Sequence, residues 1–148
     1  MRMLPLLILI GAACWAESAF GTWKLNAARS TFSGGTQPTG FTVRIDPHPK
    51  GEVFTLDKVE SDGRTTSSST ILYFDGEPRR FQDFACSGIQ SVRRVDSWTV
   101  EILRMCASGE WIRFIRRSDL QPKELVLEIT EQHPDGRRVE RRLILEKR

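Results

Sequence analysis

The sequence predicts an all-β fold, an antiparallel up-and-down barrel of about eight to ten strands, with a β-sandwich as the alternative. Short strand-like runs alternate with turn signals at intervals of roughly ten residues. No window of the sequence has sustained helical periodicity. Closely spaced strands joined by tight turns favour antiparallel neighbours, and closing the sheet removes its edges. A closed barrel is therefore expected.

The strand-like runs can be placed one by one. The predicted strands are residues 22–26, 41–46, 52–61, 65–74, 79–85, 89–95, 98–106 and 110–117, a strand around 125–130, and 137–146. Residues 27–40 are rich in Ser, Gly, Thr and Pro and are expected to form a loop across one end of the barrel. Asp-Gly pairs at 62–63 and 75–76 indicate hairpin turns.

Two of these strands alternate cleanly between apolar and polar residues. Successive side chains of a strand point to opposite faces of the sheet, so each apolar set shares one face. These residues are candidates to line a ligand cavity, although the same residues would equally fill a solid core. They are Phe41, Val43, Ile45, Leu125, Leu127 and Ile129.

The 148-residue chain suits one domain, and its first residues have the pattern of a secretory signal. Arg2 precedes an apolar run that is shorter than the roughly 20 residues a membrane span needs. We predict a signal peptide over 1–16, cleavage before Glu17, a single domain over 17–148, and a periplasmic or secreted location. The alternative is a lipoprotein signal that leaves a membrane-anchored protein acylated at Cys14.

Two cysteines remain after such cleavage, Cys86 and Cys106. A disulfide is the default in an oxidising compartment. A hairpin that turns around residues 95–97 places Cys86 opposite Cys106 to within one residue of register, at a separation that a disulfide accepts. The alternative is a pair of free cysteines packed as small apolar residues.

The formal net charge of +3 is too small to argue for nucleic acid, but arginine pairs crowd the second half of the chain. If the strand count holds, three of these pairs lie at one mouth of the barrel, together with His48 and Lys50. They would form a basic rim for an anionic head group or an anionic membrane surface, or simply be solvated strand ends beside acidic residues. The pairs are Arg79-Arg80, Arg93-Arg94 and Arg116-Arg117.

The sequence contains no recognisable catalytic or metal-binding motif. His48 and His133 are the only histidines, and each precedes a proline in a predicted turn. Neither has partners at ligand spacing, which a metal or general-base role would need. We therefore expect no cofactor, no metal and no enzymatic activity.

A short motif near the start of the predicted domain carries a family resemblance. Gly21-Thr22-Trp23 resembles the Gly-x-Trp motif on the first strand of the calycins, the lipocalins and fatty-acid-binding proteins. The wider layout is similar to that of small, secreted, uncharacterised lipocalin-like bacterial proteins. The resemblance implies that Trp23 plugs the barrel floor and that an arginine on a late strand packs across it. Arg141 is the first candidate for that arginine and Arg142 the second.

Three hypotheses about function follow. The first is an exported, monomeric binding protein that holds a small hydrophobic or amphipathic ligand inside the barrel. The second is a structural or interaction protein with a filled barrel and no small-molecule ligand. The third hypothesis is an enzyme, but the chain shows no paired acid and base that would support catalysis. A pocket of several hundred Å³ would favour the first hypothesis, and an exposed apolar or charged patch without a pocket would favour the second.

Overall fold

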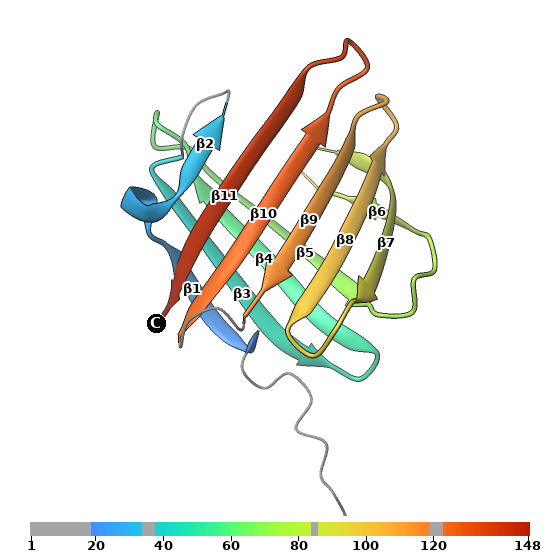
Figure 1. Ribbon diagram of the computed structural model, residues 1–148, viewed down its shortest axis with the longest axis horizontal. Coiled ribbons are helices and arrows are strands. Elements are labelled where there is room, and N and C mark those ends of the chain that lie inside the picture. Colours follow the sequence, from blue (N-terminus) through green and yellow to red (C-terminus); the bar gives the residue numbers. More distant parts are fainter. Residues whose placement is uncertain (1–18, 34–37, 84–85, 119–122) are drawn as a thin grey trace, which may run out of the picture.

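The fold is known from a computed structural model that describes residues 19–33, 38–83, 86–118 and 123–148 (Figure 1). The predicted signal peptide, its cleavage site before Glu17, and Cys14 lie outside the described residues.

Within the described residues the chain forms eleven strands and one short 3-10 helix, η2 (Ala27–Arg29). The strands are β1 (Gly21–Leu25), β2 (Thr31–Ser33), β3 (Gly40–His48), β4 (Gly51–Val59), β5 (Thr65–Tyr73), β6 (Arg79–Gln82), β7 (Ser87–Arg94), β8 (Thr99–Cys106), β9 (Trp111–Arg117), β10 (Glu124–Gln132) and β11 (Arg138–Lys147). No helix among these residues is long and apolar enough to cross a bilayer.

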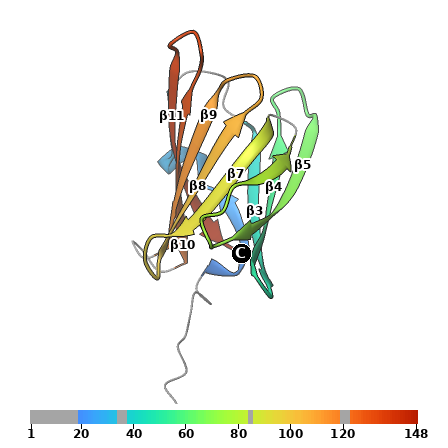
Figure 2. The same cartoon turned by 90° about the vertical axis from the view of Figure 1, so that its right-hand side faces the viewer.

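All the strands belong to one antiparallel sheet that curls into a nearly closed barrel. The order across the sheet is β5-β4-β3-β1-β11-β10-β9-β8-β7-β6. In addition, β2 pairs with residues 140–142 in the first half of β11. Figure 2 shows β3, β4 and β5 facing β7 to β10 across the interior. The predicted all-β antiparallel barrel is confirmed, and the alternative of a β-sandwich is not what forms.

Closure is incomplete at a seam between β5 and β6. The ladder ends at these two strands, and the described contacts across the seam are few. A single bridge joins Asp75 to Arg93, and the Gln90 side chain donates a hydrogen bond to Thr70 Oγ1 at 3.3 Å. The sheet therefore keeps two exposed edges, which a fully closed barrel would have removed.

The segment predicted as a loop, residues 27–40, contains short regular structure in its described part. Asn26 caps η2 because its side chain accepts a hydrogen bond from the Arg29 N–H. The hydroxyl of Ser30 donates to Asn26 O and accepts from the Ile144 N–H, which ties this segment to the outside of β11. The three residues of β2 then continue the same sheet. Sequence reasoning missed both elements because each is shorter than a periodicity window.

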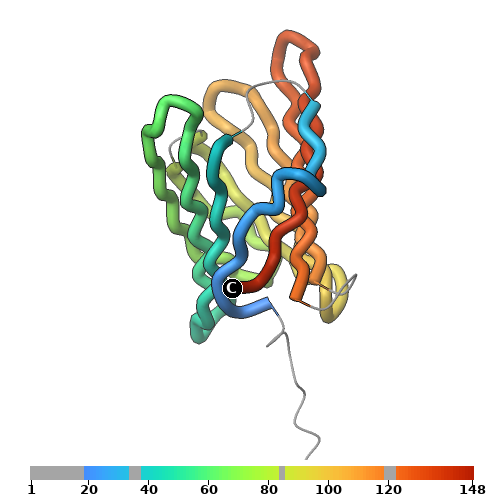
Figure 3. The backbone as a smooth tube through the Cα atoms, turned by 90° about the vertical axis from the view of Figure 1, so that its left-hand side faces the viewer, coloured from blue at the N-terminus to red at the C-terminus, as the bar shows by residue number. Residues whose placement is uncertain are grey.

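The barrel has two ends, and the C-terminus lies at the same end as the start of the described chain (Figure 3). We call the end that holds the start of β1, the C-terminus and the β3–β4 and β7–β8 turns the floor end. The upper end holds the β4–β5, β8–β9 and β10–β11 turns. At the floor end the main chain of Gly21 has φ 125°, a value that residues with a side chain rarely adopt. A Cβ at this position would lie 3.0 Å from Cε of Lys147.

Candidate functional site

Apolar side chains fill the half of the barrel nearest the floor end. We call this set the floor core. All of its members are buried and belong to one hydrophobic cluster, which continues upward through Phe41, Leu56, Phe114, Ile129 and Leu143. The floor core consists of Trp23, Val43, Ile45, Phe54, Leu72, Val92, Val100, Ile102, Leu125, Leu127 and Leu145.

Trp23 closes this end, at 1% exposure, and its indole Nε1 donates a hydrogen bond to Ala19 O at 2.9 Å. The cation near its ring is Lys147, whose Nζ lies 5.5 Å from the ring centroid and whose position pairs with Trp23 in the ladder. Arg141 lies six residues earlier on β11, roughly 20 Å along the strand. Packing of Arg141 across Trp23 was therefore the wrong expectation. Arg142 points outward beside Glu128.

The predicted basic rim contains a buried ion pair. Arg116 Nη1 lies 2.7 Å from Glu52 Oε2, and both side chains are at most 3% exposed. Arg94 Nη2 lies 3.8 Å from the other carboxylate oxygen of Glu52. Arg116 was therefore wrongly placed on a solvent-facing rim, because it lies on the inward face of β9, next to Phe54.

The other four members of the predicted rim do not form a ring around one mouth of the barrel, although Arg79 and Arg80 both line an open groove at the seam between β5 and β6. Arg79 makes two hydrogen bonds with the Asp75 carboxylate and lies over the Tyr73 ring. Arg93 pairs with Glu101 on the outer face. Arg80 is exposed on β6, and Arg117 pairs with Val126 in the ladder. His48 accepts a hydrogen bond from the Lys50 N–H within the β3–β4 turn.

A cavity of about 150 Å³ lies inside the upper half of the barrel. Its apolar lining comes from both faces of the barrel and from β2. These residues are Phe32, Pro38, Phe41, Leu56, Ile112, Phe114, Ile129 and Leu143. Of the six residues predicted to line a cavity, Phe41 and Ile129 do so, and Val43, Ile45, Leu125 and Leu127 lie in the floor core instead.

Charged residues also line this cavity, and sequence reasoning missed most of them. They are Lys58, Asp83, Arg104, Glu131 and Arg141. Arg104 is the most buried of these, at 2% exposure. It has the same strand parity as Val100 and Ile102, so period-two alternation along β8 was a signal that could have found it.

Arg104 is held by polar and aromatic neighbours. Its Nη1 donates to Asp83 Oδ2 at 2.6 Å and its Nε to Gln90 Oε1 at 2.8 Å. The guanidinium also lies 4.7 Å from the Phe81 ring centroid and 5.0 Å from that of Phe114. Burial lowers the pKa of Arg104, and the charge and hydrogen bond of Asp83 oppose that shift. The pair offers a fixed polar surface beside the apolar lining.

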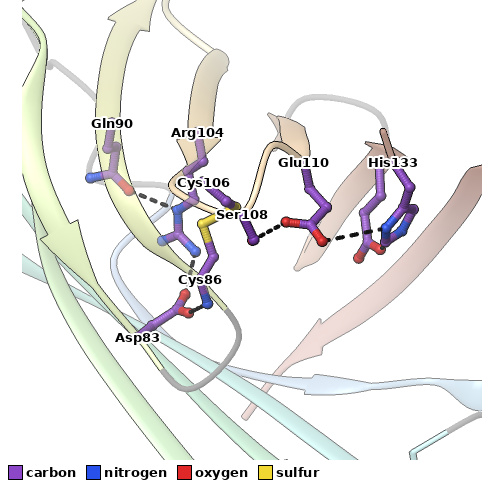
Figure 4. The surroundings of a disulfide bond; sticks show 9 residues. Asp83, Cys86, Gln90, Arg104, Cys106, Ser108, Glu110 and His133 are labelled. Carbon is purple, nitrogen blue, oxygen red and sulfur yellow. Dashed lines mark hydrogen bonds and ion pairs between the residues drawn. A yellow bond between two sulfur atoms is a disulfide. The ribbon is translucent and has the colours of Figure 1, made fainter. Parts of the chain in front are cut away.

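A disulfide between Cys86 and Cys106 fixes the segment that carries Asp83 (Figure 4). The prediction of this bridge is confirmed, but the register differs. Cys106 pairs with Gly88 and not with Cys86, and the Cα atoms of the two cysteines lie 5.4 Å apart. A Cβ on Gly88 would lie 2.0 Å from Met105 O, so only glycine allows the two strands to approach here. Asp83 exchanges hydrogen bonds with Cys86 through its main chain and its carboxylate.

A cluster of ionisable side chains surrounds His133 at the upper end, where the β8–β9 and β10–β11 turns meet. His133 Nε2 lies 3.4 Å from Glu131 Oε2, and its Nδ1 lies 3.8 Å from Glu110 Oε1 and 3.4 Å from Arg137 Nη2. Glu131 also pairs with Arg141, at 2.6 Å. No group of three or more His, Cys, Asp or Glu residues that could hold a metal ion occurs among the residues described.

An open groove of about 370 Å³ follows the seam between β5 and β6. Its lining mixes hydroxyl, amide, aromatic and charged groups, among them Ser69, Thr70, Tyr73, Phe81, Gln90, Glu77, Arg79 and Arg80. Gln90 also holds Arg104. Gln90 thus joins the wall of the seam groove to Arg104, which lines the cavity.

Comparison with known proteins supports the fold and goes no further. No protein-family model and no curated protein matches the chain. Among solved structures, the ileal bile acid-binding protein of zebrafish, crystallised with cholic acid, is similar with a TM-score of 0.56. The identity is 10%, and the match covers 88% of this chain and 99% of that one. The likeness shows a fold of the calycin type, as the Gly-x-Trp motif had indicated.

Proposed function

We propose that this protein is an exported binding protein that holds a small amphipathic ligand in the cavity of its upper half. The observation that carries the proposal is the contrast inside the barrel, where a filled floor core lies beneath a cavity lined by both apolar and charged groups. A ligand pocket combines an apolar lining with a few convergent polar groups. The zebrafish protein that shares this fold was crystallised with cholic acid, an amphipathic molecule.

The cavity volume limits what the ligand can be. About 150 Å³ is below the roughly 300 to 1,000 Å³ that encloses a drug-sized molecule. An apolar cavity of this size in another protein takes up one benzene ring. The part of the ligand that enters is therefore one ring or a short alkyl chain. Its polar part would lie toward Lys58 and Arg141 at the upper end.

Fluorescence titration tests the binding. N-Phenyl-1-naphthylamine is a neutral probe whose phenyl ring matches the cavity. We expect saturable binding that Ile129→Phe weakens at least tenfold, because the added ring would fill the space beside Phe41. Ile115→Phe is the matched control, since Ile115 lies on the outer face of the adjacent strand. Equal binding by both variants would contradict the proposal.

Export is supported by the disulfide, because such bridges form and persist in oxidising compartments. Intact mass spectrometry of the protein from its own cell separates the possibilities. A mature chain that begins at Glu17 fits a soluble exported protein, and a lipid-bearing Cys14 fits a membrane-anchored one. An unprocessed chain with reduced cysteines would contradict export. Native spectra of the same sample would also show a bound ligand and the oligomeric state, which we propose to be monomeric.

A specific observation also favours the second candidate function, an interaction protein. Ile89 and Met105 are 40% and 50% exposed and pair directly across β7 and β8, and Trp111 pairs with Met105 on β9. Exposed apolar neighbours of this kind often mark contact surfaces. A Met105→Lys variant would leave probe binding unchanged but abolish any association measured by native mass spectrometry. If it weakened probe binding as strongly as Ile129→Phe, this outer surface would not be a separate interaction site.

A further inference from the structure

We propose that His133 makes the binding of anionic ligands pH-dependent, because it competes with Arg141 for their shared counter-ion, Glu131. The inference rests on the proposed function, since it concerns the entrance of the same cavity. Protonation of His133 would draw Glu131 away from Arg141 and leave that guanidinium free to bind an anionic group of the ligand. Glu131 would then act as an internal competitor for the anion.

The geometry of Glu131 carries the proposal. Its Oε1 lies 2.6 Å from Arg141 Nη1, and its Oε2 lies 3.4 Å from His133 Nε2. One carboxylate thus contacts both groups, each through a different oxygen. Glu131 and Arg141 both line the cavity, and their side chains are about one quarter exposed. Water and a ligand head group can therefore reach the pair.

The charged groups near His133 come from three segments of the chain. Glu131 comes from β10, Glu110 from the segment before β9, and Arg137 from the β10–β11 turn. Ser108 donates a hydrogen bond to the Glu110 carboxylate. A neutral imidazole forms no ion pair with Glu110 or Glu131, whereas an imidazolium attracts both. Histidine is the ordinary side chain that changes charge between about pH 5 and 8, which sets the pH range of the test.

The other two cations of the cavity have partners that do not contact a histidine. Lys58 Nζ lies 2.9 Å from Glu60 Oε1, and Arg104 Nη1 lies 2.6 Å from Asp83 Oδ2. Neither partnership changes with the charge of His133. The effect on anion binding is therefore expected at Arg141 alone among the described cavity cations.

A pair of fluorescent probes tests this mechanism. 8-Anilinonaphthalene-1-sulfonate carries a sulfonate that stays charged throughout the range, and N-phenyl-1-naphthylamine is the same molecule without it. Between pH 8 and pH 5.5 we expect wild-type protein to bind the sulfonate about threefold more tightly, the size of a weak ion pair. The affinity for the neutral probe should not change.

Three variants assign the effect. His133→Gln should bind the sulfonate equally at both pH values. Glu131→Gln should bind it tightly at both, because the competing carboxylate is gone. His48→Gln is the matched control, since the only other histidine lies at the floor end, and it should keep the wild-type response. Circular dichroism confirms that each variant is folded.

The outcomes separate the two proposals. If both probes bind to the wild type and their affinity ratio is the same at pH 8 and pH 5.5, this inference is overturned and the binding function stands. A response that persists in His133→Gln also overturns it. If the neutral probe does not bind, or binds without regard to Ile129→Phe, the proposed function itself fails.

Discussion

The floor half and the upper half of the barrel are built from the same strands, yet their interiors differ. In the floor half, inward positions carry Trp, Phe, Leu, Ile and Val, which pack into a solid cluster around one buried ion pair, Glu52 with Arg116. In the upper half, the same strands carry Lys58, Arg104, Glu131 and Arg141 at inward positions. Long charged side chains cannot interdigitate as apolar ones do, because each must keep its partner or contact with water. The space that they leave is the cavity.

The contrast teaches that stability and binding are separated along the barrel axis. Three predictions test this division, beginning with the largest expected effect, and a fourth concerns the outer face of the barrel.

Two leucines on β11, two residues apart, compare the halves directly. Leu145 is fully buried in the floor core, and Leu143 lines the cavity at 2% exposure. We expect Leu145→Ala to lower the free energy of unfolding by about 4 kcal/mol and Leu143→Ala by about 3 kcal/mol, since Leu143 has fewer packing partners to lose. Urea denaturation measures both. Only Leu143→Ala should change probe affinity, and a change with Leu145→Ala alone would reverse the assignment of the halves.

The two buried ion pairs form the second comparison. Glu52→Gln leaves Arg116 buried without a counter-charge, which should cost about 3 to 4 kcal/mol. Asp83→Asn should cost about 2 kcal/mol, because Arg104 keeps its hydrogen bond to Gln90 and its contacts with two aromatic rings. Thermal and urea unfolding of both variants measure the difference. A larger loss with Asp83→Asn would mean that the upper half carries the stability.

Removing the disulfide should increase local opening in the upper half without the same change in the floor half. Its cysteines are separated by 20 residues, and replacing both with alanine should lower stability by about 3 kcal/mol. Hydrogen exchange should show faster opening around Asp83 and Ser87 than around Trp23. Uniformly faster exchange, with Trp23 affected as strongly, would show that the two halves open together.

The smallest effect concerns the outer face, where stability should depend on pH. Hydrogen bonds from Arg93 and Arg113 lower the pKa of Glu101. A lowered folded-state pKa adds stability above the unfolded value, about 4.3, and this stability is lost as the pH falls through the folded value. Glu101→Gln should therefore cost about 1 kcal/mol at pH 7 and progressively less below pH ~4. Glu128→Gln, whose weaker pair with Arg142 is half exposed, is the control and should change little. If the stability loss caused by Glu101→Gln stayed the same in acid, the predicted pH dependence would be wrong.

Local pattern was enough to predict the barrel, the disulfide and the first strand. Alternation placed Phe41, Val43 and Ile45 on one face, because the side-chain period of a strand is fixed by its geometry. The depth of each residue along the barrel axis could not be predicted in the same way. Depth depends on register and strand tilt across the whole sheet, which is why Val43 and Leu127 were assigned to a cavity and lie in the floor core.

The charged part of the site was harder to predict for the same reason. Glu52 and Arg116 are 64 positions apart in the sequence, and their contact exists only once the barrel closes. Likewise, the family resemblance led to the match of Arg141 with Trp23. The register pairs Trp23 with Lys147, a relation that no local pattern contains.

A crystal structure of the protein with N-phenyl-1-naphthylamine tests the central claim most directly. We expect density for the phenyl ring between Phe41, Phe114 and Leu143, with the floor core unchanged. Density only in the seam groove between β5 and β6, or a ring inserted beside Trp23, would contradict it.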